Sequence, residues 1–156
     1  MFAILPLVTS IFMLGMISLQ NASNLNSQPP VTQNTANNSG QTFLNYRGEV
    51  LTYVINHPAT LGTVATGLLS LSPQTLPAGI TNNVVATASG NGRIIYTWAT
   101  LPAGTANYLV KSQSGDASIG TTNGTVWTSP VYGIQAAVVP GFVPTGSVLS
   151  IQQIGY

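Results

Sequence analysis

The amino terminus carries an uninterrupted apolar run that constrains how the rest of the chain is placed. Residues 1–19 contain no charged side chain, and most of them are Phe, Ile, Leu, Val or Met. A helix of about 20 apolar residues is long enough to cross a bilayer. A helix that is apolar on every side is typical of a buried or membrane-spanning position. We therefore predict a transmembrane anchor over residues 1–20.

Two other interpretations of this run stay open. A cleaved signal peptide has a basic amino-terminal region and a small-x-small cleavage site, and "SLQNASNL" matches such a site poorly. A type IV prepilin has a basic leader that ends in Gly, followed by an apolar helix with a Glu near its start. Gly15-Met16 resembles that junction, but the apolar run ends soon afterwards, at Leu19, and contains no Glu.

The residues after the anchor are polar and have no apolar periodicity. Residues 21–41 are rich in Asn, Gln, Ser and Thr and contain Pro29-Pro30, and such a segment buries too little apolar surface to fold by itself. We predict a flexible linker over residues 21–41 and a folded domain over residues 42–156. Because no charged side chain precedes Arg47, translocation meets little resistance. We expect a single-pass inner-membrane protein with its domain in the periplasm.

An amphipathic helix is predicted at the start of the domain. Apolar residues recur at helical spacing over "TFLNYRGEVLTYVINHP", at positions 43, 46, 50 and 54. Thr42 is suited to cap the start of this helix, and Pro58 ends it near His57. Gly48 costs about 1 kcal/mol in a helix interior, so we expect it to allow a close approach to a sheet.

Beyond residue 61 the sequence predicts strands separated by turns. The strand-like runs are residues 82–89, 92–100, 107–115, 125–133 and 147–156. Asn91-Gly92 and Asn123-Gly124 are hairpin signals, and both "LPAG" segments, at 76–79 and 101–104, are predicted to be strand-to-strand turns. The predicted fold class is α+β, with the amphipathic helix packed on an antiparallel sheet.

Charge is scarce and excludes several function classes. Charged side chains make up 3% of the chain, against about 25% in ordinary soluble domains. A net charge of +1 provides no basic surface for a phosphate backbone, so nucleic-acid binding is not expected. The absence of cysteine excludes disulfides and cysteine-ligated metals. A near-zero net charge favours association, which leaves a homo-oligomer open.

Residues that could support catalysis are few and scattered. His57, the single histidine, follows the predicted helix, where it can interact with the carboxy-terminal end of the helix dipole without any activity. Glu49 and Asp116, the two carboxylates, could act as a pair only if the fold brought them together. Arg47 and Glu49 are two residues apart, so they do not face each other. One of them could pair with a sheet residue, and a solvated helix face is the preferred prediction. No glycine-rich nucleotide motif is present, and we expect no enzyme activity, cofactor or metal.

Aromatic residues gather in the strand-rich half of the chain. Trp98, Trp127 and Tyr132 could together form a docking surface for a protein or a sugar. Aromatic residues in strands also commonly belong to the core. We name Trp98, Trp127 and Tyr132 as the candidate interaction surface.

Several short segments resemble one protein family. They are the apolar amino terminus, the polar spacer, "FLNYRGEVLTYVINHP", "GTV", "LSLSPQTLPAG", "YTWATLPAG" and "YLV". Over about residues 43–115 and the anchor, they resemble the small PilM proteins encoded with the thin, type IVb pili of conjugative plasmids. The helix followed by G-T-V and L-P-x-G is also similar to the amino-terminal part of type IVb pilins, which implies a pilin-like arrangement of helix and sheet.

This resemblance implies a non-enzymatic component of type IVb (thin) pilus biogenesis in the bacterial envelope, acting in conjugation or adherence. Its implied partners are pilins or other pilus-assembly proteins, together with the inner membrane. Two alternatives stay open. One is a minor pilin incorporated in the fibre, and the other is a secreted carbohydrate-binding or adhesin module.

Overall fold

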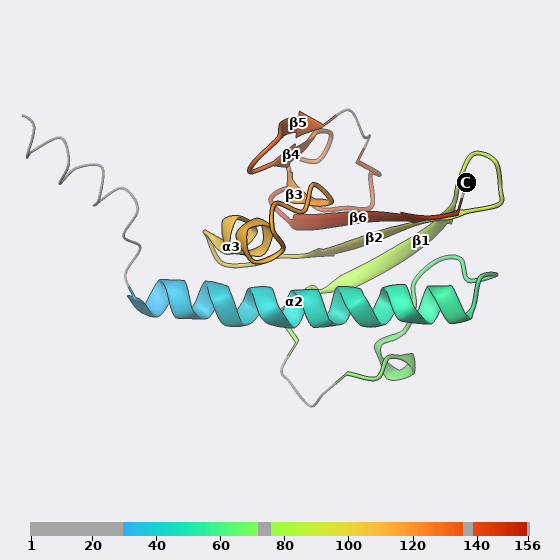
Figure 1. Ribbon diagram of the computed structural model, residues 1–156, viewed down its shortest axis with the longest axis horizontal. Helices are drawn as coiled ribbons and strands as arrows, with labels where there is room; N and C mark the ends of the chain where they lie inside the picture. Colours follow the sequence, from blue (N-terminus) through green and yellow to red (C-terminus); the bar gives the residue numbers. More distant parts are fainter. Residues whose placement is uncertain (1–29, 72–75, 136–138, 156) are drawn as a thin grey trace, which may run out of the picture. The chain divides into compact units, whose positions relative to one another are not determined.

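The computed structural model describes residues 30–71, 76–135 and 139–155 (Figure 1). The predicted anchor over residues 1–20 and the first part of the predicted linker, residues 21–29, lie outside the described residues. Within the described part of the chain, no helix is both long and apolar enough to cross a membrane. A compact unit begins at Thr35, inside the first described helix.

The described residues form two α-helices and a six-stranded antiparallel sheet (Figure 1). In chain order the elements are α2 (Pro30–Asn56), the 3₁₀ turn η1 (Thr66–Leu68), β1 (Thr81–Ala86), β2 (Arg93–Ala99), α3 (Thr105–Ser112), β3 (Ile119–Thr122), β4 (Trp127–Ser129), β5 (Gly133–Gln135) and β6 (Val148–Ile154). The strand order is β1-β2-β6-β3-β4-β5, so the carboxy-terminal strand pairs between β2 and β3. The predicted α+β class and antiparallel sheet are confirmed.

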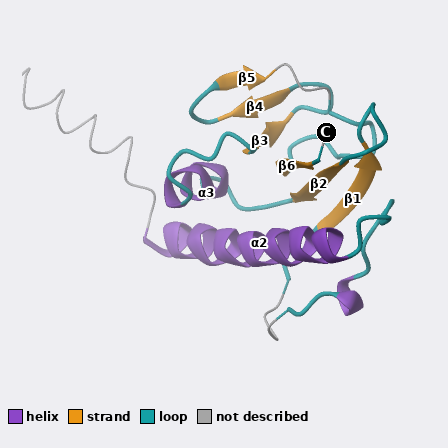
Figure 2. Ribbon diagram, turned by 45° about the vertical axis from the view of Figure 1, so that its right-hand side comes forward, coloured by secondary structure: helices purple, strands orange, loops and turns teal. Residues whose placement is uncertain are grey.

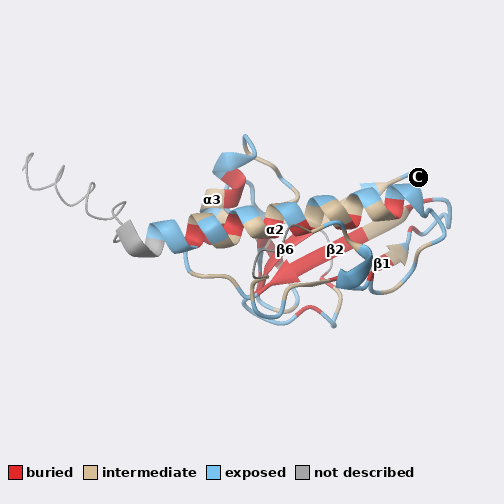
Figure 3. Ribbon diagram, turned by 90° about the horizontal axis from the view of Figure 1, so that it is seen from below, coloured by how far each residue is buried: buried red, intermediate tan, exposed pale blue. Residues whose placement is uncertain are grey.

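The predicted apolar stripe of α2 is confirmed and faces the sheet. Phe43, Tyr46, Val50 and Val54 are each 0–1% exposed. Figure 3 shows the alternation of buried and exposed residues along α2, beside the buried strands β2 and β6. Burying each such side chain contributes about 1.5–3 kcal/mol relative to leaving it in water. The stripe therefore accounts for much of the attachment of α2 to the sheet.

Apolar clusters lie on both faces of the sheet. The first, under α2 and α3, contains Phe43, Ala99, Leu109, Val110, Ile119 and Val148. The second, under the later turns of α2, contains Tyr46, Val50, Val54, Val64, Val84 and Ile95. The third contains Tyr96, Trp98, Trp127, Val139, Val143 and Leu149. Successive side chains of a strand point to opposite faces, so Ile95 and Tyr96 of β2 belong to clusters on opposite sides.

The predicted linker is wrong over residues 30–41, because α2 begins at Pro30 rather than near Thr42. Proline suits the first helical position, where its missing N–H leaves no bond unmade. The early turns then pack through small residues: Ala36 is 2% exposed, and Gly40 is buried. Because Val31 is the one aliphatic residue larger than alanine in this stretch, hydrophobic periodicity does not reveal the helix.

Residues 107–115 are mostly helical, which corrects the strand predicted there. α3 follows Gly104, whose φ of 86° is a conformation that favours glycine. The helix ends where the N–H of Gly115 donates to the carbonyl oxygen of Val110 at 2.8 Å, with a φ of 85° at Gly115. This arrangement is typical of a glycine-terminated helix.

The other predicted strands are confirmed with adjusted bounds, as β1, β2, β4 and β6. Asn91-Gly92 and Asn123-Gly124 lie between β1 and β2 and between β3 and β4, as predicted. The "LPAG" at 101–104 leads from β2 into α3, and the copy at 76–79 precedes β1, so neither connects two strands. Strand β3 lies outside the predicted runs, and β5 overlaps them only at Gly133.

The close approach to a sheet predicted at Gly48 is wrong, and Gly40 instead lies close to helix α3. A Cβ on Gly40 would lie 2.7 Å from Tyr108 Cδ1 and 3.3 Å from Leu109 Cδ2, whereas a Cβ on Gly48 would meet nothing within 4 Å.

Gly48→Ala is expected to raise the free energy of unfolding by about 0.5–1 kcal/mol, because alanine loses less conformational entropy in a helix. Gly40→Ala is expected to lower it by about 1–3 kcal/mol through overpacking.

Urea unfolding followed by tryptophan fluorescence measures both substitutions on the same helix. Equal stabilisation by Gly40→Ala and Gly48→Ala would contradict the tight contact between α2 and α3 at Gly40.

Candidate interaction surface

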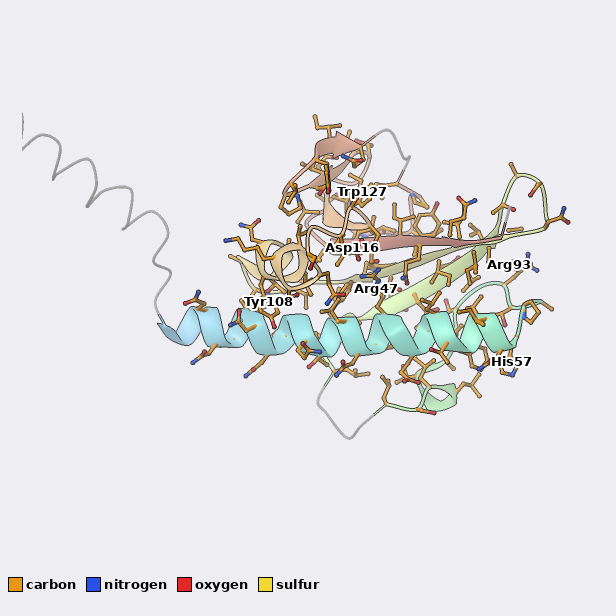
Figure 4. All side chains as sticks on the ribbon, in the orientation of Figure 1. Arg47, His57, Arg93, Tyr108, Asp116 and Trp127 are labelled. Atoms are coloured by element: carbon orange, nitrogen blue, oxygen red, sulfur yellow. The ribbon has the colours of Figure 1, made fainter. Side chains whose placement is uncertain are left out.

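Arg47 of α2 connects three parts of the fold through a partly buried polar cluster (Figure 4). Its Nη1 lies 2.8 Å from Asp116 Oδ2, in the loop between α3 and β3, and its Nη2 donates to Ser118 Oγ at 2.9 Å. With its amide oxygen turned toward the guanidinium, Gln152 of β6 accepts from Nη2 at 3.0 Å and Nε at 3.2 Å. The Arg47 side chain is only 12% exposed, so the solvated position preferred for it is wrong, and the alternative contact with a sheet residue occurs at Gln152.

The same cluster stabilises the charged form of Asp116. Partial burial by itself raises the pKa of this carboxyl. Hydrogen bonds from Ser118 and the charge of Arg47 outweigh that effect, so the pKa of Asp116 lies below the ordinary value of 3.8. The N–H of Ser118 donates to Asp116 Oδ1 at 2.8 Å. The loop that leads into β3 is thereby held against α2.

A second buried polar contact connects α2 to β1. The side chain of Asn82 is fully buried. Its Nδ2 donates to Tyr46 Oη at 2.7 Å and to the Val64 carbonyl at 3.0 Å, and its Oδ1 accepts from the Val64 N–H at 2.9 Å. Burial raises the pKa of the Tyr46 phenol, and hydrogen bonds from Asn82 and Thr66 partly offset that increase. These groups are occupied by structural contacts and do not form a ligand site.

The residues with catalytic potential are not brought together. Glu49 Oε2 accepts from the Ser70 N–H at 3.2 Å, whereas Asp116 belongs to the Arg47 cluster. His57 Nδ1 donates to the Tyr53 carbonyl at 3.0 Å at the end of α2, and the two rings stack at 4.2 Å. Among the described residues, no three His, Asp or Glu side chains are close enough to hold a metal ion. The expectation of no enzyme activity stays a prediction.

Two of the three residues of the predicted interaction surface belong to the core instead. Trp98 and Trp127 are 7% and 6% exposed and lie in the third cluster. The ring of Phe142 covers Trp98 at a centroid distance of 5.4 Å. The predicted surface is therefore wrong for both tryptophans, because their strand positions point inward. Tyr132, which is 55% exposed, is at the surface.

An exposed apolar patch surrounds Tyr132. Val131 is 58% exposed and Ile134 is 75% exposed, and both lie within two residues of Tyr132. We call Val131, Tyr132 and Ile134 the β5 patch; it occupies the turn before β5 and the centre of that strand. No residue after Asp116 has a charged side chain, so the strands and turn that carry the patch contribute no charge of their own.

The β5 patch borders a part of the sheet that the helices leave open (Figure 2). Thr121, Thr128 and Ile134 lie opposite one another on β3, β4 and β5, so their side chains share one face. Val148, which lies opposite Thr121, belongs to the first cluster under the helices, so this is the helix-bearing face. A groove of about 280 Å³ lies between the start of α3 and strands β3 and β4.

Comparison with known proteins identifies the family. The sequence matches a protein-family model described as PilM over residues 9–151. The chain belongs to the PilM family. Membership links it to pilus-related systems and confirms the family resemblance drawn from its short segments.

The PilM fold is also found in a solved structure. A crystal structure of a PilM protein from Escherichia coli B7A is similar to this chain, with a TM-score of 0.55 and 15% sequence identity. The similarity covers 81% of this chain and 97% of that chain. At this identity the likeness concerns the fold alone. No curated protein matches the sequence.

Substitutions in the core and in the β5 patch should differ in their effect on the free energy of unfolding. Trp98→Ala and Trp127→Ala are each expected to lower the free energy of unfolding by about 3–5 kcal/mol, because each leaves a large cavity. Tyr132→Ala is expected to change it by less than about 0.5 kcal/mol, as an exposed substitution. Urea unfolding measures all three; an unchanged stability for both tryptophan variants would contradict their core position.

Asp116→Asn is expected to lower the free energy of unfolding at pH 7 by about 1–3 kcal/mol, because it removes hydrogen bonds to a charged group. The pKa of Asp116 is lower in the folded chain than the ordinary 3.8. Its stabilising effect is therefore present above that value and is lost as the pH falls through the folded pKa. The difference from wild type should shrink below about pH 4. Urea unfolding at several pH values tests this, and a constant difference would contradict it.

Proposed function

We propose that this protein is a structural accessory component of type IVb (thin) pilus biogenesis, acting in conjugation or adherence. Residues 1–20 would anchor it in the inner membrane, with the folded domain in the periplasm. The observation that carries the proposal is the PilM family match over residues 9–151. The uncharged apolar run at the amino terminus supports the anchor.

The surface of the domain supports a role in protein contacts. Arg47 and Asp116 are engaged with each other, and the two buried tryptophans are unavailable to a sugar. The β5 patch instead exposes neutral, mainly apolar side chains, which fit another protein surface better than a charged or small polar ligand. We propose that pilins or other pilus-assembly proteins bind at Val131 and Tyr132 of this patch.

A pilus assay tests the proposed role. Cells that lack the gene are expected to lose thin pili, counted by electron microscopy, and to transfer plasmid DNA at least tenfold less often. The wild-type gene should restore both. The double substitution Val131→Ser with Tyr132→Ser should fail to restore them, while Leu68→Ser should restore them as a matched change at an exposed apolar residue, 58% exposed like Val131. Normal pili in the deletion strain would refute the proposal.

Fractionation and amino-terminal mapping test the anchor. An intact amino terminus in the inner-membrane fraction supports it. A soluble product that lacks the first 20 residues would refute it. A product that begins at Met16 within purified pili would instead identify a minor pilin.

A further inference from the structure

The two edges of the sheet differ in how they are covered. Along β1, the backbone groups of Gly62 and Val84 exchange two hydrogen bonds of 2.8 Å, and the Val64 backbone bonds to the Asn82 side chain. The segment around residues 62–64 therefore covers that edge. At the other end, β5 pairs with β4 on one side, and no described element lies on its outer side (Figure 2).

The open edge is short but lacks the other features that usually prevent strand pairing. Natural edge strands are commonly protected by very short length, charged side chains, proline or a covering segment, and β5 has three residues. Gly133–Gln135 contains neither a charge nor a proline, and no charged side chain follows Asp116 in the chain. Ile134, at the centre of β5, is 75% exposed. Its edge is therefore suited to accept another strand.

Two carbonyl groups at or just before the start of β5 accept hydrogen bonds from the Gln135 side chain. The Gln135 side-chain amide donates to the carbonyl oxygens of Tyr132 and Gly133, at 3.2 and 3.1 Å. These are short-range contacts of an exposed side chain. An incoming strand could replace them with backbone hydrogen bonds at little cost, because the amide can then bond to water.

We propose that β5 pairs with β5 of a second copy of this chain, antiparallel and about a two-fold axis, so that the sheet continues through both copies. Two-fold pairing places equivalent residues opposite each other, with Ile134 at the centre. A charged edge would repel its own copy, whereas this edge is neutral and the whole chain carries only +1. β5 has three residues, so the dimer is weak and concentration-dependent.

Disulfide trapping tests this pairing in cells that produce the full chain. The chain has no cysteine, so each introduced cysteine reports only its own position. Directly opposed residues of antiparallel strands have Cα atoms about 4.5–5.5 Å apart, a distance that a disulfide can bridge. Ile134→Cys is expected to give a cross-linked homodimer under mild oxidation, at least fivefold above the controls.

The controls are matched in exposure and position. Ala86→Cys is exposed at the end of the covered edge strand β1, and Leu68→Cys is exposed outside the sheet. Gln135→Cys tests the register, because its opposite residue in the proposed pairing is Gly133, and it should cross-link less than Ile134→Cys. Equal cross-linking at all positions, or none at Ile134→Cys, would refute the proposal. So would a cross-link from Ile134→Cys only to a different protein.

Co-purification of two differently tagged full-length copies provides a second readout. Ile134→Lys in both copies should reduce recovery at least fivefold, whereas Ile134→Val should preserve it. Both variants should keep the wild-type urea unfolding midpoint, because the side chain is largely exposed. Unchanged recovery with Ile134→Lys would overturn the proposal. The inference does not rest on the pilus role, and since neither readout involves pili, its failure would leave the proposed function standing.

Discussion

The packing of one helix face against the sheet is the contact on which the rest of this fold depends. The apolar stripe of α2 contributes to both clusters on the helix-bearing face. The short helix α3 contributes Leu109 and Val110 to the first of these clusters, where they join Phe43 of α2. Without α2, both of these clusters would be open to water. The glycine at position 40 matters for the same reason, because it lets α3 approach α2 closely.

The chain has few charged side chains, and two of them, Arg47 and Asp116, form a structural ion pair. Arg47 and Asp116 connect α2 to the loop before β3, where a partly buried ion pair with additional hydrogen bonds is costly to break. The remainder of the chain relies on neutral side chains for its polar surface. A neutral surface is less soluble and associates more readily, a property that suits a PilM-family protein proposed to work within an assembly.

Sequence patterns succeeded where a side chain's position is set by local periodicity and turn chemistry. The α2 stripe, the β1–β2 hairpin and β6 are of this kind. The strand predicted over residues 107–115 is a helix, α3. The short apolar run that includes Leu109 and Val110 is compatible with either a strand or a helix. The flanking Gly104 and Gly115 were the available signal for a capped helix. For the candidate surface, residue type alone could not separate the buried Trp98 and Trp127 from the exposed Tyr132.

The sequence by itself determined the α+β class, the apolar face of α2, the antiparallel pairing of the main strands and the resemblance to PilM proteins. These depend on periodicity, turn residues and short motifs, all of which are local. Tertiary structure alone decided that residues 30–41 are helical, that Arg47 meets Asp116 and that β6 lies between β2 and β3. It also decided which strand is left open at the edge, since that depends on contacts between residues far apart in the chain.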